Sequence, residues 1–186
     1  MRVIAGSARR LQLKTLEGLD TRPTQDIIKE TLFNVIQNLV PGSSFLDLFA
    51  GSGAIGIEAL SRGAVNAVFI EQNRKASKII EENLSFTKLA DRGTVVTCDV
   101  MIGLNQLEKK GAFDIIHMDP PYEAGLEKNV LSYLKDSKLV KEDTLIILEA
   151  SNKTDLSYIV DLGYIIEKEK IYKHNRHLFM RVEKSE

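Results

Sequence analysis

The sequence predicts an α/β fold with a seven-stranded, mostly parallel sheet, a C-terminal antiparallel hairpin and a small N-terminal extension. Three observations predict it. Short apolar runs alternate with amphipathic segments, a glycine-rich loop follows the first run, and an acidic residue closes each of the first three. The 186 residues, 44% hydrophobic and 27% charged, suit one globular domain and exclude a disordered or collagen-like chain.

The N-terminal 40 residues are predicted to form an extension that precedes a main domain at residues 41–186, within one compact unit. Residues 2–4 and 11–14 have the pattern of a small hairpin. After Pro23, apolar residues recur at helical spacing: Ile27, Ile28, Leu32, Val35, Ile36 and Leu39. We expect this helix to cover a face or an edge of the sheet.

The main domain alternates between expected strands and expected crossover helices. The strands are apolar or β-branched runs at residues 45–49, 67–70, 94–98, 113–118 and 144–148. The helices are amphipathic stretches at residues 54–62, 74–86, 101–109 and 126–134. Two further strand-like runs, 164–172 and 178–182, are joined by five residues, too few for a crossover helix, so we expect an antiparallel hairpin with a basic tip.

The net charge of −1 is unevenly spread along the chain. Residues 1–24 carry +3, residues 168–181 carry +4, and residues 25–167 carry −7. This division favours a body that binds a small cationic ligand and two ends that face a polyanion, although ordinary solvated faces would give the same counts.

Other features of the composition narrow the class of protein. The single cysteine, Cys98, excludes an internal disulfide framework and a cysteine-based metal cluster, and no other residues have metal-ligand spacing, so we expect no metal. No apolar run approaches the ~18 residues that would span a bilayer, and the first ten residues do not resemble a signal peptide. We therefore expect a cytoplasmic protein, with a monomer as the default.

The glycine-rich loop after the first strand is the candidate cofactor site. It contains G-x-G-x-x-G within residues 47–56, which alone would suit a nicotinamide or flavin dinucleotide. Asp47, four residues before the first glycine, places a carboxylate where a pyrophosphate would lie, which favours a cationic ligand instead. The loop residues expected to bind the cofactor are Phe49, Ala50, Gly51, Ser52 and Gly53.

Two more acidic residues close the next two strands. Glu71 lies 20 residues after the first glycine, where an acid can hold both ribose hydroxyls, and Asp99, followed by Val100, ends the third strand. S-adenosylmethionine has a sulfonium, an ammonium, a ribose and an adenine amine for these acids to bind. The simpler alternative is that Glu71 and Asp99 cap the helices that follow them.

The catalytic candidates follow the fourth strand at Asp119, Pro120, Pro121 and Tyr122. The two prolines fix the backbone and leave the Pro120 carbonyl free as an acceptor beside the Asp119 carboxylate. Together these acceptors can hold an exocyclic amine with its nitrogen lone pair toward a methyl donor, and Tyr122 can stack on the base. A strand-ending turn is the alternative interpretation, and His117 is expected to be a core residue rather than a base.

These motifs resemble the class I S-adenosylmethionine-dependent methyltransferases and, among them, the bacterial 16S rRNA guanine-N2 methyltransferase D family. The most particular block is Thr21-Arg22-Pro23-Thr24 followed by residues 29–34, with residues 47–53 and 119–122 in support. The resemblance implies a Rossmann-like fold and methylation of one guanine of 16S rRNA, with the small ribosomal subunit as partner. It assigns the methionine end of the cofactor to Asp47, Gly51 and Gly53, the ribose to Glu71, the adenine to Asp99, and the guanine to residues 119–122.

The same resemblance, with the charge distribution, indicates where RNA binds. The expected RNA-binding residues are Arg9, Arg10, Arg22, Thr24, Lys173 and Arg176. Residues 7–11 depart from the family, whose basic-glycine-basic turn lacks its glycine here. Arg22 has a local role as its alternative, at the start of the helix.

Three other functions stay open at this point. An adenine-N6 DNA methyltransferase could use the same tetrapeptide, although the chain has no room for a separate target-recognition domain. A nicotinamide-dependent oxidoreductase would share the glycine loop, but Asp47 and Asp119 argue against it. The third alternative is a methyltransferase-like RNA chaperone that binds RNA without turnover.

Overall fold

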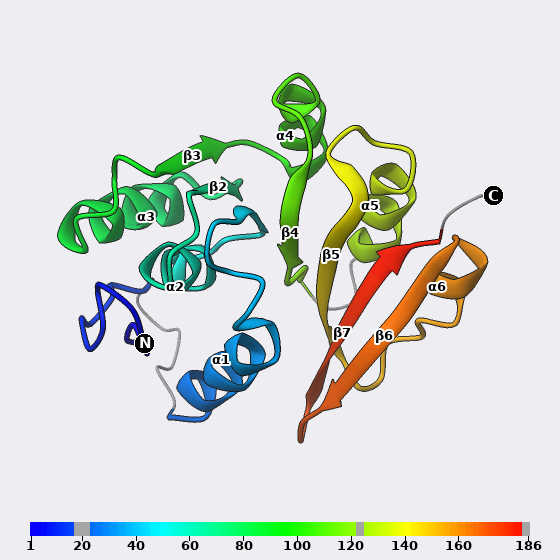
Figure 1. The fold of residues 1–186 in the computed structure, drawn as a ribbon, viewed down its shortest axis with the longest axis horizontal. Coiled ribbons are helices and arrows are strands. Elements are labelled where there is room, and N and C mark those ends of the chain that lie inside the picture. The colour runs from blue at the N-terminus through cyan, green and yellow to red at the C-terminus, as the bar shows by residue number, and fades with distance from the viewer. Residues whose placement is uncertain (17–22, 122–124, 184–186) are drawn as a thin grey trace.

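A seven-stranded mixed sheet organises the chain, with strand order β3-β2-β1-β4-β5-β7-β6 (Figure 1). The structure, a computed structural model, describes residues 1–16, 23–121 and 125–183. Strands β1 to β5 run parallel, while β7 pairs antiparallel with both β5 and the edge strand β6. The strands are β1 Ser44–Leu48, β2 Asn66–Glu71, β3 Gly93–Thr97, β4 Phe113–Met118, β5 Val140–Ser151, β6 Tyr164–Ile171 and β7 Asn175–Val182.

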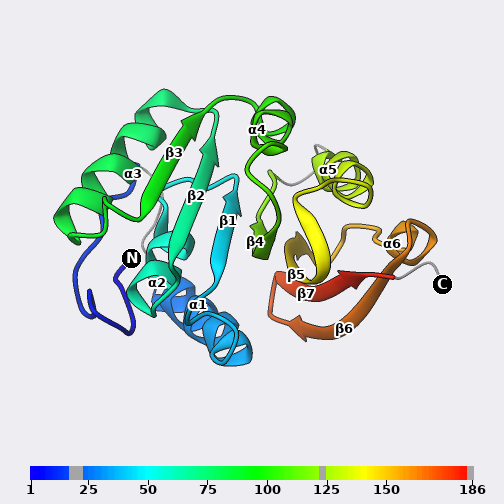
Figure 2. The same cartoon turned by 45° about the horizontal axis from the view of Figure 1, so that its top comes forward.

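Helices cover both faces of the sheet and bury two apolar layers (Figure 2). On one face lie α1 (Pro23–Ile36), α2 (Ala54–Ser61) and α3 (Arg74–Phe86), and on the other lie α4 (Val100–Leu107), α5 (Leu126–Leu134) and α6 (Tyr158–Asp161). Alternate residues of each central strand enter the two layers, as Phe45 and Leu46 of β1 do. Apolar residues on both faces are what a parallel sheet between two helical layers requires.

The predicted fold class is confirmed, and three differences from the expected strands and helices exceed the one or two residues by which other bounds differ. Strand β5 extends over residues 140–151, the short helix α6 was not expected, and β7 begins at Asn175 rather than at residue 178. The last difference has a clear cause, since Asn175 and His177 are polar yet buried on a strand, where their side chains contact Glu149. An apolar pattern could not locate this start.

The first 16 residues pack onto the same core as the main domain. Arg2 and Gln12 form an isolated antiparallel bridge, and backbone hydrogen bonds join residues 3 and 11 and residues 13 and 1, so the expected pairing is present in short form. Val3, Ala8 and Leu13 are buried in the layer of α1, α2 and α3. Among the described residues, no helix is both long enough and apolar enough to cross a membrane.

Candidate active site

The glycine loop joins β1 to α2 through residues in the left-handed backbone region. Phe49 has φ 61°, Gly51 has φ 56° and Gly53, the N-cap of α2, has φ 76°. A bulky residue at positive φ is strained, and such strain is concentrated at functional sites. Gly56 has another role, because a Cβ there would lie 2.3 Å from the Phe69 ring of β2, so the glycine lets the helix approach the sheet.

Asp47 is placed by β1 but its carboxylate is turned inside the protein. One oxygen accepts the Gly56 N–H at 2.9 Å and the other contacts His117 Nδ1 at 3.2 Å. The residue is only 1% exposed. Asp47 therefore fixes the start of α2 and the His117 ring. Its carboxylate positions the glycine loop, whereas the sequence predicted that it would bind the cofactor directly.

Glu71 and Asp99 remain at the carboxyl edge of the sheet. Glu71 accepts the Gly51 N–H at 2.8 Å and the Asn73 N–H at 2.8 Å, which ties the end of β2 to the glycine loop. Asp99 caps α4, with Oδ1 accepting the Met101 N–H at 2.8 Å, and it is exposed. The capping role that the sequence left open is thus present for Asp99 but not for Glu71, because Asn73 is the N-cap of α3. A carboxylate oxygen has further lone pairs with which to bind a ligand.

The catalytic candidates lie where β4 ends. Asp119 and Pro121 are exposed, Pro120 is buried, and Tyr122 lies outside the described residues. Asp119 reaches solvent, but desolvation by the surrounding chain, together with the nearby charges of Glu149 and Asp47, outweighs the opposing charge of His117 and raises the pKa of Asp119 to about 7. An acceptor with such a pKa can both bind an amine and take a proton from it.

A second carboxylate, which sequence reasoning missed, lies beside this loop on β5. Glu149 accepts hydrogen bonds from His177 Nε2, at 2.9 Å, and from the Asn175 side-chain amide. Burial alone would raise the pKa of Glu149, but the His177 hydrogen bond and charge hold it below the usual value. We call Asp47, His117, Asp119, Glu149 and His177 the acidic edge. In sequence, Glu149 closes an apolar run as Glu71 does, which is the signal that could have found it.

The two histidines of the acidic edge are buried and only half satisfied. Within the described chain, His117 Nε2 and His177 Nδ1 have no hydrogen-bond partner. Burial lowers the pKa of His117, but its hydrogen bond to Asp47 and the charges of Asp47, Asp119 and Glu149 outweigh this and raise the pKa. His117 is a core residue, as predicted, but one in contact with the site.

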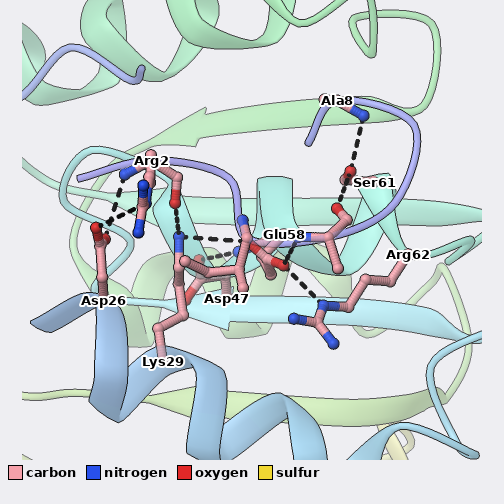
Figure 3. A network of polar contacts seen from close by, with 11 residues as sticks. Arg2, Ala8, Asp26, Lys29, Asp47, Glu58, Ser61 and Arg62 are labelled. Carbon is pink, nitrogen blue, oxygen red and sulfur yellow. Dashed lines mark hydrogen bonds and ion pairs between the residues drawn. The ribbon is translucent and has the colours of Figure 1, made fainter. Parts of the chain in front are cut away.

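A buried ion cluster on α2 anchors the N-terminal segment (Figure 3). Glu58 accepts the backbone N–H groups of residues 4 and 5, at 2.8 and 3.0 Å, and pairs with Lys29 of α1 at 3.3 Å and with Arg62 at 2.7 Å. Ser61 donates to the carbonyl of residue 5 and accepts the Ala8 N–H. We call Lys29, Glu58, Ser61 and Arg62 the N-terminal clasp.

The clasp holds a turn that presents two of the expected RNA-binding residues. Arg9 and Arg10 are exposed, and neither side chain forms a hydrogen bond or ion pair with the rest of the described chain. Gly6 packs so closely on α2 that a Cβ would lie 1.8 Å from the Ser61 carbonyl oxygen. Arg10 has φ 72°, so it adopts the conformation that a glycine would favour in the turn where the family's glycine is missing.

The other expected RNA-binding residues have different surroundings. Lys173 is exposed in the turn between β6 and β7. Arg176 lies within β7 rather than at the predicted tip, and it pairs with Glu169 at 3.2 Å and donates to the Thr154 carbonyl at 2.7 Å. Arg22 and the side chain of Thr24 lie outside the described part of the chain.

Asn83 of α3 links the N-terminal segment to the glycine loop. Its amide donates to the carbonyl oxygens of Lys14 and Ser52, both at 3.0 Å, and its side-chain oxygen accepts the Lys14 N–H at 2.8 Å. The residue is buried and all of these bonds are satisfied at once. The predicted RNA-contacting segment and the predicted cofactor loop thus share one side chain.

Comparison with known proteins identifies the family. The family described as Conserved hypothetical protein 95 matches residues 1–180. The Escherichia coli K12 ribosomal RNA small subunit methyltransferase D is 34% identical over 92% of this chain and 84% of its own length. The chain belongs to the ribosomal RNA small subunit methyltransferase D family.

Other members and solved structures agree with this assignment to the methyltransferase D family. The Haemophilus influenzae methyltransferase D is 33% identical over 91% of this chain and 88% of its own length. The solved Escherichia coli protein yhhF has a TM-score of 0.84 at 32% identity, covering 100% of this chain and 99% of that one. The predicted family, fold and methyltransferase activity are thereby confirmed.

Proposed function

We propose that this protein transfers a methyl group from S-adenosylmethionine to the exocyclic N2 amine of one guanine in 16S rRNA. The observation that carries the proposal is the Asp119-Pro120 acceptor pair at the end of β4, next to the glycine loop after β1, its partner strand. Membership of the methyltransferase D family supports the RNA substrate. The assembled or assembling small subunit, rather than free rRNA, is the form of the substrate that we propose, in the cytoplasm and with a monomeric enzyme.

The residues around the glycine loop fit the cofactor. Strained Phe49 and the left-handed glycines shape the loop before α2, while Glu71 and Asp99 offer carboxylate oxygens at the ends of β2 and β3. These acceptors suit ribose hydroxyls and an adenine amine, and the negative body of the chain suits a sulfonium. The cofactor-binding residues that we propose are Phe49, Ala50, Gly51, Ser52, Gly53, Glu71, Asp99 and Val100, with Asp47 acting through the loop that it fixes.

The chemistry asked of the protein is orientation and electrostatics. S-adenosylmethionine supplies an electrophilic methyl group on sulfur. Asp119 and the Pro120 carbonyl accept the two amine hydrogens and turn the nitrogen lone pair toward that carbon, so that a C–N bond forms as the C–S bond breaks. The methylated nitrogen then loses a proton, which Asp119 is placed to take, and Tyr122 next in sequence would stack on the base.

RNA recognition is assigned to residues 1–40 and to the β6–β7 turn. Arg9 and Arg10, on a turn anchored to α2, and Lys173 would contact phosphate groups. Arg22 and Thr24 are proposed to act with them. Arg176 would contribute charge from β7, where it is already paired with Glu169.

Transfer of radiolabelled methyl from S-adenosylmethionine tests the proposal. The substrates are small ribosomal subunits from a strain deleted for this gene, naked 16S rRNA and unmodified genomic DNA. We expect label in the N2 amine of a single guanine of the subunit, with less in naked rRNA. Label in DNA adenine would keep the catalytic loop and overturn the substrate, whereas absence of label in all three would overturn the activity.

A further inference from the structure

Glu149 occupies a position that the proposed methyl transfer does not use. Strands β4 and β5 are paired in parallel register up to Met118 and Leu148, and the next residues are Asp119 and Glu149. Neighbouring strands lie about 5 Å apart, so the two residues that follow this last pair are close in space. The charge of Glu149 is also felt at Asp119, as expected of neighbours. Two carboxylates therefore stand side by side at the place where the target amine is to be held.

The Glu149 carboxylate is fixed in orientation from behind. His177, which is 1% exposed, donates to one oxygen and Asn175, which is 9% exposed, donates to the other. The Tyr172 ring packs edge-on against the His177 ring, with centroids 5.1 Å apart. The Glu149 side chain is itself 18% exposed. A carboxylate has about four acceptor positions, so about two remain for a group that approaches from outside.

Guanine and adenine differ in what they present to such a pair of acceptors. Beside its N2 amine, guanine carries an N1–H donor, so three hydrogens lie along one edge. Adenine carries a lone pair on N1 beside its N6 amine. A fixed carboxylate next to the amine-binding residues would accept the guanine N1–H, but it would face and repel the adenine lone pair.

We propose that Glu149 selects guanine by accepting its N1–H while Asp119 and Pro120 hold the N2 amine. This inference rests on the proposed function, and it gives that function its substrate base. It also explains why buried His177 and Asn175 both hydrogen-bond to the Glu149 carboxylate, since an acceptor that is already held in place loses less conformational freedom on binding. The adenine alternative that the sequence left open is disfavoured by the same residue.

A guanine analogue separates this role from a structural one. 2-Aminopurine keeps the N2 amine but has an N1 lone pair in place of N1–H. Once the modified guanine has been mapped, small subunits are reconstituted with guanine or 2-aminopurine at that position, and kcat/KM for methyl transfer is measured. For the wild-type enzyme we expect 2-aminopurine to be the poorer substrate by about 10²-fold or more, because the Glu149 carboxylate would face the N1 lone pair of the analogue instead of an N1–H donor.

Glu149→Gln is the test variant and Glu167→Gln the matched control. The side-chain amide of the Glu149→Gln variant would offer an N–H to the N1 lone pair of the analogue, so the preference for guanine should fall by about 10-fold or more. Glu167, on β6, pairs with Arg181 away from β4, and its variant should keep the wild-type preference. A thermal shift with S-adenosylhomocysteine shows that each variant is folded.

Each outcome has a distinct meaning. Equal use of the two bases by the wild-type enzyme overturns the role of Glu149, even if Glu149→Gln does not fold. An unchanged preference in a folded Glu149→Gln variant also overturns it. If the wild-type enzyme labels no guanine, the proposed function itself has failed, whereas guanine labelling without base preference defeats only this inference.

Discussion

The N-terminal clasp and the acidic edge both contain buried charged or titratable side chains, but they differ in how completely those side chains are hydrogen-bonded. In the clasp, Glu58 is surrounded by two backbone donors, Lys29 and Arg62. In the acidic edge, His117 Nε2 and His177 Nδ1 lack partners among the described residues, and Asp119 is crowded by other carboxylates. Complete pairing is typical of a structural cluster, while incomplete pairing in a fixed frame is typical of a binding or catalytic site.

Breaking the clasp should have the largest effect on stability. Glu58→Ala leaves the Lys29 side chain, 2% exposed, without its carboxylate. Removing one partner of a buried ion pair typically costs about 3–5 kcal/mol, so we expect the free energy of unfolding in a denaturant titration to fall by this amount. Glu82→Ala, which removes the exposed partner of Lys14, is the control and should leave the midpoint nearly unchanged. Equal effects of the two variants would show that the clasp is no more than a surface pair.

Breaking the acidic edge should instead slow methyl transfer and spare the fold. Asp119→Ala removes one of the two amine acceptors, and we expect single-turnover methyl transfer to slow by about 10²–10³-fold. Affinity for S-adenosylhomocysteine, measured by calorimetry, should stay close to wild type. Asp91→Ala, at an exposed carboxylate, is the control. Methyl transfer at a near wild-type rate would remove Asp119 from the mechanism.

Glu71 tests the cofactor half of the site. Glu71→Ala should weaken binding of S-adenosylmethionine by about 1–3 kcal/mol, because it removes ribose contacts and frees the Gly51 N–H that Glu71 holds. Calorimetric titration gives the dissociation constant, with Glu81→Ala on α3 as an exposed control. If the constant did not change, Glu71 would serve only to tie the end of β2 to the glycine loop.

The crowding of carboxylates at the acidic edge predicts a pH dependence. In the cofactor-free protein, a ¹³C NMR titration of Asp119 should show a midpoint near the pKa of about 7. Only ionised Asp119 accepts the amine hydrogens, so RNA methylation should decline as the pH falls through the pKa of Asp119. With cofactor bound, this pKa is lower than in the free protein, because the positive sulfonium stabilises the ionised carboxylate. Glu149→Gln removes a repelling charge and should move the midpoint down, and an upward shift would contradict the arrangement.

The smallest effect is expected at the basic turn. Arg10 has φ 72°, so Arg10→Gly should relieve strain and raise the free energy of unfolding by about 1 kcal/mol, while it weakens RNA binding and lowers the salt slope by about one. Arg9→Ala should weaken RNA binding similarly without the gain in stability. A loss of stability in Arg10→Gly would mean that the arginine side chain, not the backbone, holds the turn.

The sequence predicted most of the fold and the edge of the sheet at which the candidate site lies. Apolar runs located β1 to β5, and their terminal acids marked the edge at which Asp47, Glu71, Asp99 and Asp119 gather, because periodicity and strand ends are local properties. The partners of those acids were not predictable in this way. That Asp47 turns inward, or that Glu149 pairs with His177, depends on contacts between residues 28 to 70 positions apart.

The same limit applies to the clasp. Lys29 and Glu58 lie on helices, where charged residues are expected to face solvent, yet both are buried. Lys29 and Glu58 are buried because residues 1–16 cover them. The groups of this segment that bond to them are backbone atoms, which are the same for every residue type, so the sequence does not reveal the contact.

The anchoring of residues 1–16 also determines when this segment can fold onto the rest of the chain during synthesis. The side chains that hold residues 4, 5, 8 and 14 belong to residues 58, 61 and 83, so this segment cannot dock fully until those later residues have also left the ribosome. Its arginines are then free of the fold while the nascent chain is still attached. The segment would therefore dock only after α2, α3 and the glycine loop have folded.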